Sequence, residues 1–231
     1  MHDGQHFYAR FLAIIMWVTK LSAYRKLRKM KFFDYNLTTD IHSINLIDRN
    51  VLTPIVVNCL NPHSFVTAEV DACFKESLLS STYLLPDGIG VCMALKRYKG
   101  IRIDKIAGED FHYELLSQLN EKGGKLLYMG SNNVVLGLIE DRIHREYPNI
   151  IVKTHSPSYC EDFSTIENKE LVSIVNEFAP DALLVGMTAP KQEKWLAKWQ
   201  KKLQVKLFMG IGGSFDVLAG NSWIGSRSRE S

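Results

Sequence analysis

A carboxylate inside a glycine-containing turn is the first residue whose type and surroundings point to chemistry. Asp87 stands in the string Leu85–Gly90 (LPDGIG), directly after a short apolar run. The two glycines let the backbone turn sharply and approach a ligand closely. In a cleft, burial raises the pKa of a carboxyl group, and Asp87 could then be the general base that takes a proton from an attacking hydroxyl. The alternative is a turn aspartate, because Pro-Asp-Gly is a common turn string.

Asn61 is a second polar residue at the end of an apolar run, Pro54–Leu60. An asparagine amide both donates and accepts hydrogen bonds, so it can bind a sugar hydroxyl. The same side chain is also a preferred N-cap, and an amphipathic stretch follows it directly. The sequence leaves both roles open.

The segment Lys125–Asn133 (KLLYMGSNN) places Gly130 between a strand pattern and a helix start. A strand, a glycine turn and a helix N-terminus together form an arrangement that binds phosphate groups. The segment carries neither a GxGxxG fingerprint nor a P-loop. A plain tight turn therefore explains it equally well.

The segment Gly210–Asp216 (GIGGSFD) follows another buried strand pattern. The backbone amides of Gly212 and Gly213 could donate hydrogen bonds to an anion, and Asp216 could bind a ribose or sugar hydroxyl. A structural glycine turn is the alternative.

Lys191 and Gln192 lie in the string Gly186–Trp195 (GMTAPKQEKW), after a further apolar run. Pro190 suits the first turn of a helix, which puts both side chains at a helix N-terminus. There they can meet a diphosphate or a sugar, or they can simply be the solvated charges of a helix start. The sequence has no DxD pair, HExxH or GxSxG string, so it predicts no metal site and no serine hydrolase.

The elements that position these residues alternate between strand and helix patterns. Such alternation predicts an α/β fold, a Rossmann-like and mainly parallel sheet with helices on both faces. Ligands of such sheets bind beyond the carboxyl ends of the strands, so we expect the candidate residues to share one edge. The predicted strands are Pro54–Leu60, Thr82–Leu85, Lys125–Gly130, Ile150–Thr154, Asp181–Met187 and Val205–Gly210. The predicted helices are His63–Ser80, Glu109–Glu121, Asn133–Tyr147, Thr165–Phe178 and Lys191–Lys202.

The composition is that of a globular protein with a full core. Of 231 residues, 46% are apolar and 23% are charged, and the net charge of +3 is too small to indicate a nucleic-acid partner. The four cysteines form no CxxC pair, which argues against a zinc site or a disulfide framework.

The first 50 residues differ from the rest. An apolar stretch, Phe11–Val18, is followed by six basic residues between Lys20 and Lys31. It is shorter than the roughly 18 apolar residues that a transmembrane helix needs. Such a segment can lie on an anionic membrane surface, or it can be a packing helix with a charged face. We therefore predict an N-terminal extension, residues 1–50, and a single α/β domain, residues 51–231, with a boundary near residue 122 as an alternative.

Taken together, the strings resemble the WecG/TagA/CpsF family of glycosyltransferases, glycosyltransferase family 26. The resemblance covers Pro54 to Gly220 and depends on the order NP, PDGIG, IAGEDF, GSNN, VGMTAPKQEKW and GIGGSFDVLAG. Each string alone is weak, whereas PDG-x-G, G-x-x-x-PKQE-x-W and G-x-GG-x-FD together are specific.

The resemblance implies a hexosyltransferase without a cofactor or metal. Such an enzyme moves a hexosamine, hexuronic acid or hexose, with inversion, from a UDP-sugar donor to a saccharide on a polyprenyl diphosphate. It implies Asp87 as base, Asn61 and Gln192 in the pocket, and the glycine turns near Gly130 and Gly212 around the nucleotide. It also implies a homo-oligomer and a peripheral place on the cytoplasmic face of the membrane, in the synthesis of cell-surface polysaccharide or teichoic acid.

Three departures from the family pattern bear on activity. Cys59 stands where the family usually has threonine. Lys105 stands where the family usually has arginine. Lysine lacks the planar guanidinium that binds a diphosphate through two hydrogen bonds, although Lys105 or Lys191 can still offset the charge of the diphosphate. After Gly220 the chain reads NSWIGSRSRES, where the family continues with a basic appendage.

The alternative function is therefore a catalytically impaired UDP-sugar-binding protein. A Rossmann oxidoreductase is a third hypothesis, which the missing GxGxxG disfavours.

Overall fold

The computed structural model describes residues 34–38, 41, 53–100 and 102–220. The predicted N-terminal extension lies almost entirely outside these residues, so its membrane contact and its boundary at residue 50 stay predictions. None of the helices in the described ranges is both long enough and apolar enough to cross a membrane.

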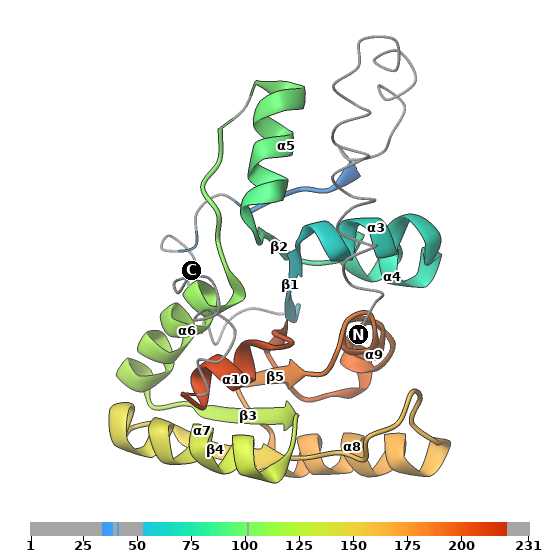
Figure 1. Ribbon diagram of the computed structural model, residues 1–231. Coiled ribbons are helices and arrows are strands. Elements are labelled where there is room, and N and C mark those ends of the chain that lie inside the picture. Colours follow the sequence, from blue (N-terminus) through green and yellow to red (C-terminus); the bar gives the residue numbers. More distant parts are fainter. Residues whose placement is uncertain (1–33, 39–40, 42–52, 101, 221–231) are drawn as a thin grey trace, which may run out of the picture. The chain divides into compact units, whose positions relative to one another are not determined.

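Within the described residues, six strands form one parallel sheet in the order β2-β1-β6-β5-β3-β4 (Figure 1). The strands are β1 (Ile55–Leu60), β2 (Tyr83–Pro86), β3 (Lys125–Gly130), β4 (Ile151–His155), β5 (Ala182–Gly186) and β6 (Leu207–Gly210). Strands from both halves of the chain pair within this sheet, because β1 lies between β2 and β6. The alternative boundary near residue 122 therefore does not divide the sheet.

Both faces of the sheet carry apolar side chains, because successive residues of a strand point to opposite faces. Leu126 and Tyr128 of β3 pack in one core cluster and Leu127 and Met129 in the other. The first cluster includes side chains of α6 (Gly108–Lys122), α7 (Asn133–Glu146) and α10 (Ser214–Leu218). The second includes side chains of α8 (Thr165–Phe178) and α9 (Lys191–Trp199), and α9 continues into a 3-10 turn, Gln200–Lys202. The predicted layer arrangement is confirmed.

The helix predicted at His63–Ser80 is two helices, α3 (Pro62–Val70) and α4 (Ala72–Leu79). Asp71 separates them, because its backbone is extended and its side chain accepts a hydrogen bond from Phe74 N at 3.0 Å, as the N-cap of α4. The helix predicted to run to Lys202 ends as an α-helix at Trp199. Two helices, α5 (Ile89–Lys99) and α10, were not predicted, because both begin in glycine-containing strings that indicate turns.

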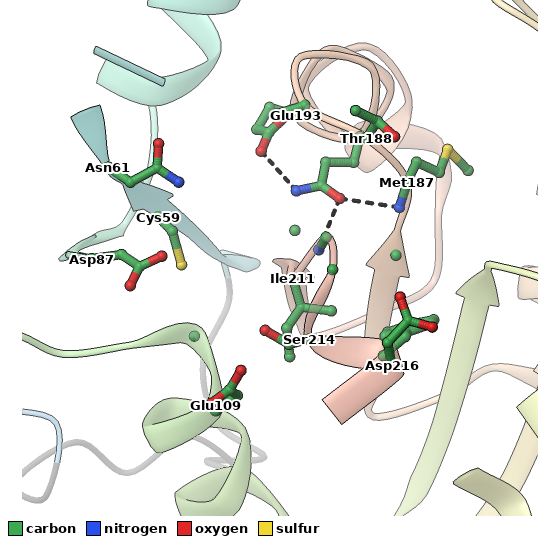
Figure 2. A pocket seen from close by; sticks show the side chains of 18 of the residues that line it. Cys59, Asn61, Asp87, Glu109, Met187, Thr188, Glu193, Ile211, Ser214 and Asp216 are labelled. Atoms are coloured by element: carbon green, nitrogen blue, oxygen red, sulfur yellow. Dashed lines mark hydrogen bonds between the residues drawn. The ribbon is translucent and has the colours of Figure 1, made fainter. Parts of the chain in front are cut away.

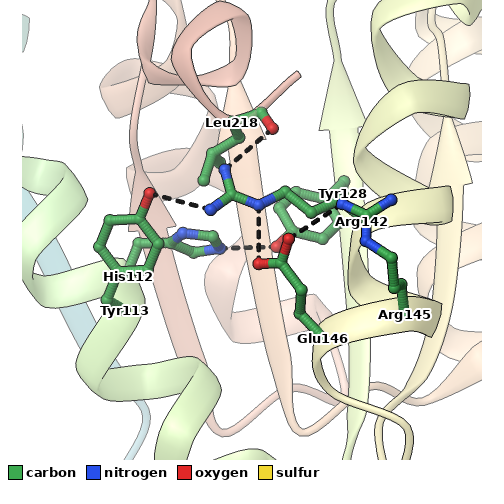
Figure 3. Close-up of polar contacts among 7 residues, drawn as sticks. All are labelled: His112, Tyr113, Tyr128, Arg142, Arg145, Glu146 and Leu218. Carbon is green, nitrogen blue, oxygen red and sulfur yellow. Dashed lines mark hydrogen bonds and ion pairs between the residues drawn. The ribbon is translucent and has the colours of Figure 1, made fainter. Parts of the chain in front are cut away.

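Polar contacts tie α6, α7 and α10 together (Figure 3). Arg142 of α7 donates to the Leu218 carbonyl oxygen at 3.2 Å and to Glu146 Oε2 at 2.9 Å. Beneath this arginine, His112 of α6 and the Tyr128 hydroxyl of β3 share a buried hydrogen bond of 2.6 Å. The last turn of α10 is thus anchored to α7, which fixes the short helix that carries Asp216.

Candidate active site

A cavity of about 580 Å³ lies at the carboxyl ends of β1, β2, β5 and β6 (Figure 2). Its volume falls within the range of roughly 300–1,000 Å³ that is typical of small-molecule sites. Six residues singled out from the sequence line it, namely Asn61, Asp87, Gln192, Gly212, Gly213 and Asp216. The parallel sheet brings together turns that are up to 155 residues apart, counted from Asn61 to Asp216.

Asp87 is the first residue after β2 and its side chain is half-buried. Its backbone N–H donates to Leu60 O at 3.0 Å, which fastens the PDG turn to the end of β1. Burial is the main cause that raises the pKa of Asp87, and the neighbouring Glu109 carboxylate also raises it. Lys105 and a hydrogen bond from Asn61 act in the opposite direction, yet the pKa stays above the ordinary aspartate value.

Asn61 performs the capping role that the sequence left open and lines the cavity as well. Its Oδ1 accepts hydrogen bonds from Ser64 N at 2.8 Å and from Ser64 Oγ at 3.1 Å, at the N-terminus of α3. Its amide nitrogen is the group left to donate toward Asp87. One side chain therefore fixes a helix start and stabilises the charged form of the carboxylate.

Gln192 lies in the wall of the cavity with only 4% of its surface exposed. Its Oε1 accepts hydrogen bonds from Met187 N at 3.1 Å and from Gly212 N at 3.0 Å. Its Nε2 donates to Glu193 Oε1 at 2.8 Å (Figure 2). Gln192 thus joins the turn after β5 to the turn after β6, and the Gly212 amide predicted to meet an anion already binds Gln192.

A sequence model of the WecG/TagA/CpsF glycosyl transferase family matches residues 33–223. The chain belongs to this family. The enzyme named N-acetylglucosaminyldiphosphoundecaprenol N-acetyl-beta-D-mannosaminyltransferase of Bacillus subtilis (strain 168) is 29% identical over 197 residues, which cover 84% of this chain and 74% of the relative. The enzyme of the same name from Staphylococcus aureus (strain MRSA252) is 29% identical over 160 residues, covering 69% and 61%. The predicted family and the predicted class of enzyme, a glycosyltransferase, are confirmed.

A second cavity of about 780 Å³ adjoins the first in this family member. The two share Ser131 and the segment Gly186–Ala189 as a wall, and Gly130 and Lys191 line only the second. The Lys191 ammonium lies 3.7 Å from the centroid of the Phe163 ring and donates to Cys160 O at 2.5 Å. The second cavity is larger, but the carboxylates Asp87, Glu109 and Asp216 line the first, which is therefore the better candidate for the reaction centre.

Gly130 has a structural reason to be glycine. Its φ is +135°, and a Cβ there would lie 2.2 Å from the carbonyl oxygen of Gly186, the residue paired with it across β3 and β5. The tight turn that the sequence offered as an alternative is therefore present. A contact between Gly130 and substrate stays a prediction.

Lys105 lies apart from the other predicted site residues. It is exposed in the extended segment before α6 and lines neither of the two cavities. Its link to the site is electrostatic, because its charge lowers the pKa of Asp87. Lysine in this position can thus tune the carboxylate without touching it.

Three titratable residues that line the first cavity were not predicted as site residues, although they stand inside or beside the quoted strings. Glu109 belongs to IAGEDF, Glu193 follows Gln192 in PKQE, and Cys59 was noted only as a departure from the family. Burial raises the pKa of the Cys59 thiol well above its usual value, and Asp87, Glu193 and Glu109 raise it further. The thiol therefore stays protonated and is a poor nucleophile.

Proposed function

We propose that this chain is an inverting glycosyltransferase that moves an N-acetylhexosamine, hexuronic acid or hexose from a UDP-sugar to a saccharide carried on a polyprenyl diphosphate. This step belongs to the synthesis of cell-surface polysaccharide or teichoic acid. The observation that carries the proposal is Asp87, a half-buried carboxylate of raised pKa on a cavity where four strands end. The names of the relatives, which describe mannosaminyl transfer to N-acetylglucosaminyldiphosphoundecaprenol, support it.

In the proposed reaction, Asp87 takes the proton from the acceptor hydroxyl as its oxygen attacks the anomeric carbon of the donor. The bond between that carbon and the diphosphate oxygen breaks, and UDP leaves with the electron pair. A single displacement inverts the anomeric centre. The raised pKa of Asp87 suits this task, because a base works best when its pKa approaches the operating pH.

The donor nucleotide is proposed to lie in the second cavity, with its diphosphate directed toward the first. The strands β5 and β3 are neighbours in the sheet, with β6 on the far side of β5 and β4 on the far side of β3. The connection from β5 to β6 and the connection from β3 to β4 therefore lead away from each other. Nucleotides bind in the crevice that such a divergence creates in α/β sheets. Lys191, at the start of α9, supplies positive charge beside the shared wall, which would stabilise the leaving UDP.

We also propose that the reaction needs no divalent cation. The support is the sequence, which has no DxD pair to hold a metal-bound diphosphate. Turnover is expected to be unchanged by EDTA, and loss of turnover that Mg²⁺ or Mn²⁺ restores would contradict this part of the proposal.

The acceptor side of the site is proposed to face an anionic lipid surface through α5. This helix begins two residues after Asp87 and exposes Ile89 and Met93, which are 68% and 63% accessible, on the same side one turn apart. Its last turn is basic and it contains no acidic residue. Apolar side chains beside cationic ones are the pattern that binds anionic bilayers. The predicted homo-oligomer has no such support and stays a prediction.

The proposal is tested by UDP release from a panel of UDP-sugars with a short-chain polyprenyl-diphosphate saccharide as acceptor. Asp87→Asn is expected to lower turnover by about 10²–10⁴-fold, because it removes the base, while UDP binding is retained. For the natural chain, kcat/KM should fall as the pH drops through the raised pKa of Asp87, since a protonated carboxyl cannot accept a proton. Equal turnover of the two proteins would refute Asp87 as base, and UDP binding without transfer would indicate the impaired binding protein instead.

A further inference from the structure

Glu193 is a buried carboxyl group that the proposed mechanism does not use. It lines the first cavity beside Gln192, yet only 3% of its surface is exposed. Its Oε1 accepts one hydrogen bond, from Gln192 Nε2 at 2.8 Å, and its Oε2 has no hydrogen-bond partner. Among the described residues, no lysine, arginine or histidine forms an ion pair with it.

The amide of Gln192 has two ends that differ in chemistry, and its surroundings allow only one orientation. The backbone N–H groups of Met187 and Gly212 both need an acceptor, which Oε1 provides. A flipped amide would direct its NH₂ group at these two donors and its oxygen at Glu193 Oε1. Glu193 supplies the acceptor that makes the observed orientation favourable, because the NH₂ group would otherwise be a buried donor without a partner.

We propose that Glu193 is a positioning residue, which holds the Gln192 amide so that the turns after β5 and β6 stay locked together around the cavity. Met187 belongs to the wall shared by both cavities, and Gly212 borders the first. We call these hydrogen bonds of Gln192, to Met187 N, Gly212 N and Glu193 Oε1, the lock. Without it, both turns would become more mobile. The geometry of the lock stands by itself, whereas its effect on UDP binding depends on the proposed function.

The charge of Glu193 follows from the same surroundings. A buried carboxylate without a cation is costly, so these surroundings favour the neutral form of the group. The titratable groups that share its cavity are Cys59 from β1, Asp87 after β2, Glu109 of α6 and Asp216 of α10, and none of them is a cation. Burial accordingly raises the pKa of Glu193, and only its hydrogen bonds oppose this.

The raised pKa of Glu193 gives donor binding a pH dependence of known sign. Because its pKa is raised, the carboxyl is neutral below that pKa and becomes charged as the pH rises through it. The new negative charge would lie in the wall that meets the UDP diphosphate. We therefore expect UDP affinity to be highest below this raised pKa and to fall as the pH rises through it.

The test compares the full chain with Glu193→Gln, Glu193→Met and the control Glu170→Met, which removes an exposed carboxylate of α8. UDP affinity is measured by calorimetry over a series of pH values upward from the ordinary glutamate pKa, and amide hydrogen exchange is followed at Met187 and Gly212. Glu193→Gln keeps an oxygen acceptor for Gln192, so it should bind UDP as the natural chain does while Glu193 is neutral, but should lose the fall in affinity with rising pH. Glu193→Met should weaken UDP about tenfold or more and speed exchange at both amides, since a buried donor loses its partner.

Three results would overturn the proposal. These are normal exchange at both amides in folded Glu193→Met, equal weakening by Glu193→Gln and Glu193→Met, or a fall of UDP affinity with rising pH that persists in Glu193→Gln. If the natural chain binds no UDP, the proposed function fails, but the exchange experiment still decides whether Glu193 locks the turns. If Glu193→Met does not fold, the exchange rates and the pH dependence of Glu193→Gln decide.

Discussion

At the scale of single residues, Asn61 shows how one side chain can connect stability to catalysis. Its oxygen caps α3 through Ser64, and its nitrogen is left to donate toward Asp87. Capping needs only the oxygen, whereas the contribution by which Asn61 opposes the raised pKa of Asp87 depends on the N–H donor. A substitution that keeps the oxygen but removes the donor therefore separates the two roles.

Asn61→Asp is the substitution that makes this separation. Aspartate is as good an N-cap as asparagine, so the free energy of unfolding should change by less than about 1 kcal/mol. A second carboxylate beside Asp87 should raise the pKa of Asp87 further, because like charges disfavour ionisation. The acid limb of the pH–rate profile is expected to move to higher pH, and a set of kcat/KM measurements across pH checks it.

Asn132 offers a matched control. It caps α7 in the same way, with Oδ1 accepting from Val134 N and Val135 N at 3.0 Å each, and it lines the second cavity but not the first. Asn132→Asp makes the same chemical change at a comparable cap. Its new carboxylate can weaken binding of the donor, but the pH of the acid limb should stay in place, because Asn132 is not one of the groups that shift the pKa of Asp87. Identical limbs in the Asn61→Asp variant and the natural chain would refute the contact with Asp87.

The sequence predicted several of the residues that line the first cavity, but not what each one does there. Asp87, Asn61 and Gln192 could be named because each follows a recognisable apolar run, and parallel strands end at one edge. The side-chain oxygen of Gln192 accepts hydrogen bonds from two backbone amides only because β5 and β6 are neighbours in the sheet. This neighbourhood is set by the sheet order, which no local string encodes.

At the scale of elements, apolar runs located all six strands to within two residues at each end. Glycine-containing strings caused the omissions, because Gly88 begins α5 with a φ of +87° and Gly213 precedes α10. Glycine is read as a turn residue in a sequence, whereas here it lets the chain enter a helix directly from the end of a strand. The break between α3 and α4 was missed because Asp71 caps α4 only through its extended backbone conformation, which the sequence does not show.

The contact between α6 and β3 gives the fold a pH dependence. Burial, with a smaller contribution from Arg142, lowers the pKa of His112 from its ordinary 6.5 to about 3. Between these values the unfolded chain binds a proton at this residue and the folded chain does not. The free energy of unfolding is therefore highest above the ordinary pKa and falls as the pH decreases, by up to about 1.4 kcal/mol per pH unit.

His112→Gln removes this titration while keeping a polar side chain near the Tyr128 hydroxyl. We expect the variant to be less stable than the natural chain at neutral pH but to lose less stability between about pH 7 and 5. Urea unfolding at several pH values measures both slopes. His144→Gln, which changes an exposed histidine of α7, is the control and should keep the natural slope. A His112→Gln slope equal to that of the natural chain would disprove the buried, neutral histidine.

At the scale of the whole sheet, every strand ends at the edge where the cavity lies, and α5 begins there too. Gly88 is both the residue after Asp87 and the N-cap of α5. Whatever α5 contacts is therefore held close to the proposed base. A saccharide on a polyprenyl diphosphate stays at the membrane surface, so a helix that touched lipid at this place would present the base to it.

Vesicle binding tests this role of α5. Ile89→Ser with Met93→Ser is expected to weaken binding to vesicles of equimolar phosphatidylcholine and phosphatidylglycerol by about tenfold or more, since each buried CH₂ contributes about 0.8 kcal/mol. Lys96→Gln, in the last turn of α5, should weaken it by about 1 kcal/mol, and only when the vesicles contain phosphatidylglycerol. Flotation assays measure both effects.

A matched control carries Val70→Ser with Ile166→Ser, which removes apolar side chains that are 86% and 70% exposed on α3 and α8. If apolar exposure alone drove binding, this control would lose as much affinity as the α5 variant. If α5 contacts the lipid, the control binds like the natural chain. Equal binding by the α5 variant and the natural chain, or no binding by either, would contradict the proposed lipid contact, while the cavity and its carboxylate would remain subject to the separate test of UDP release.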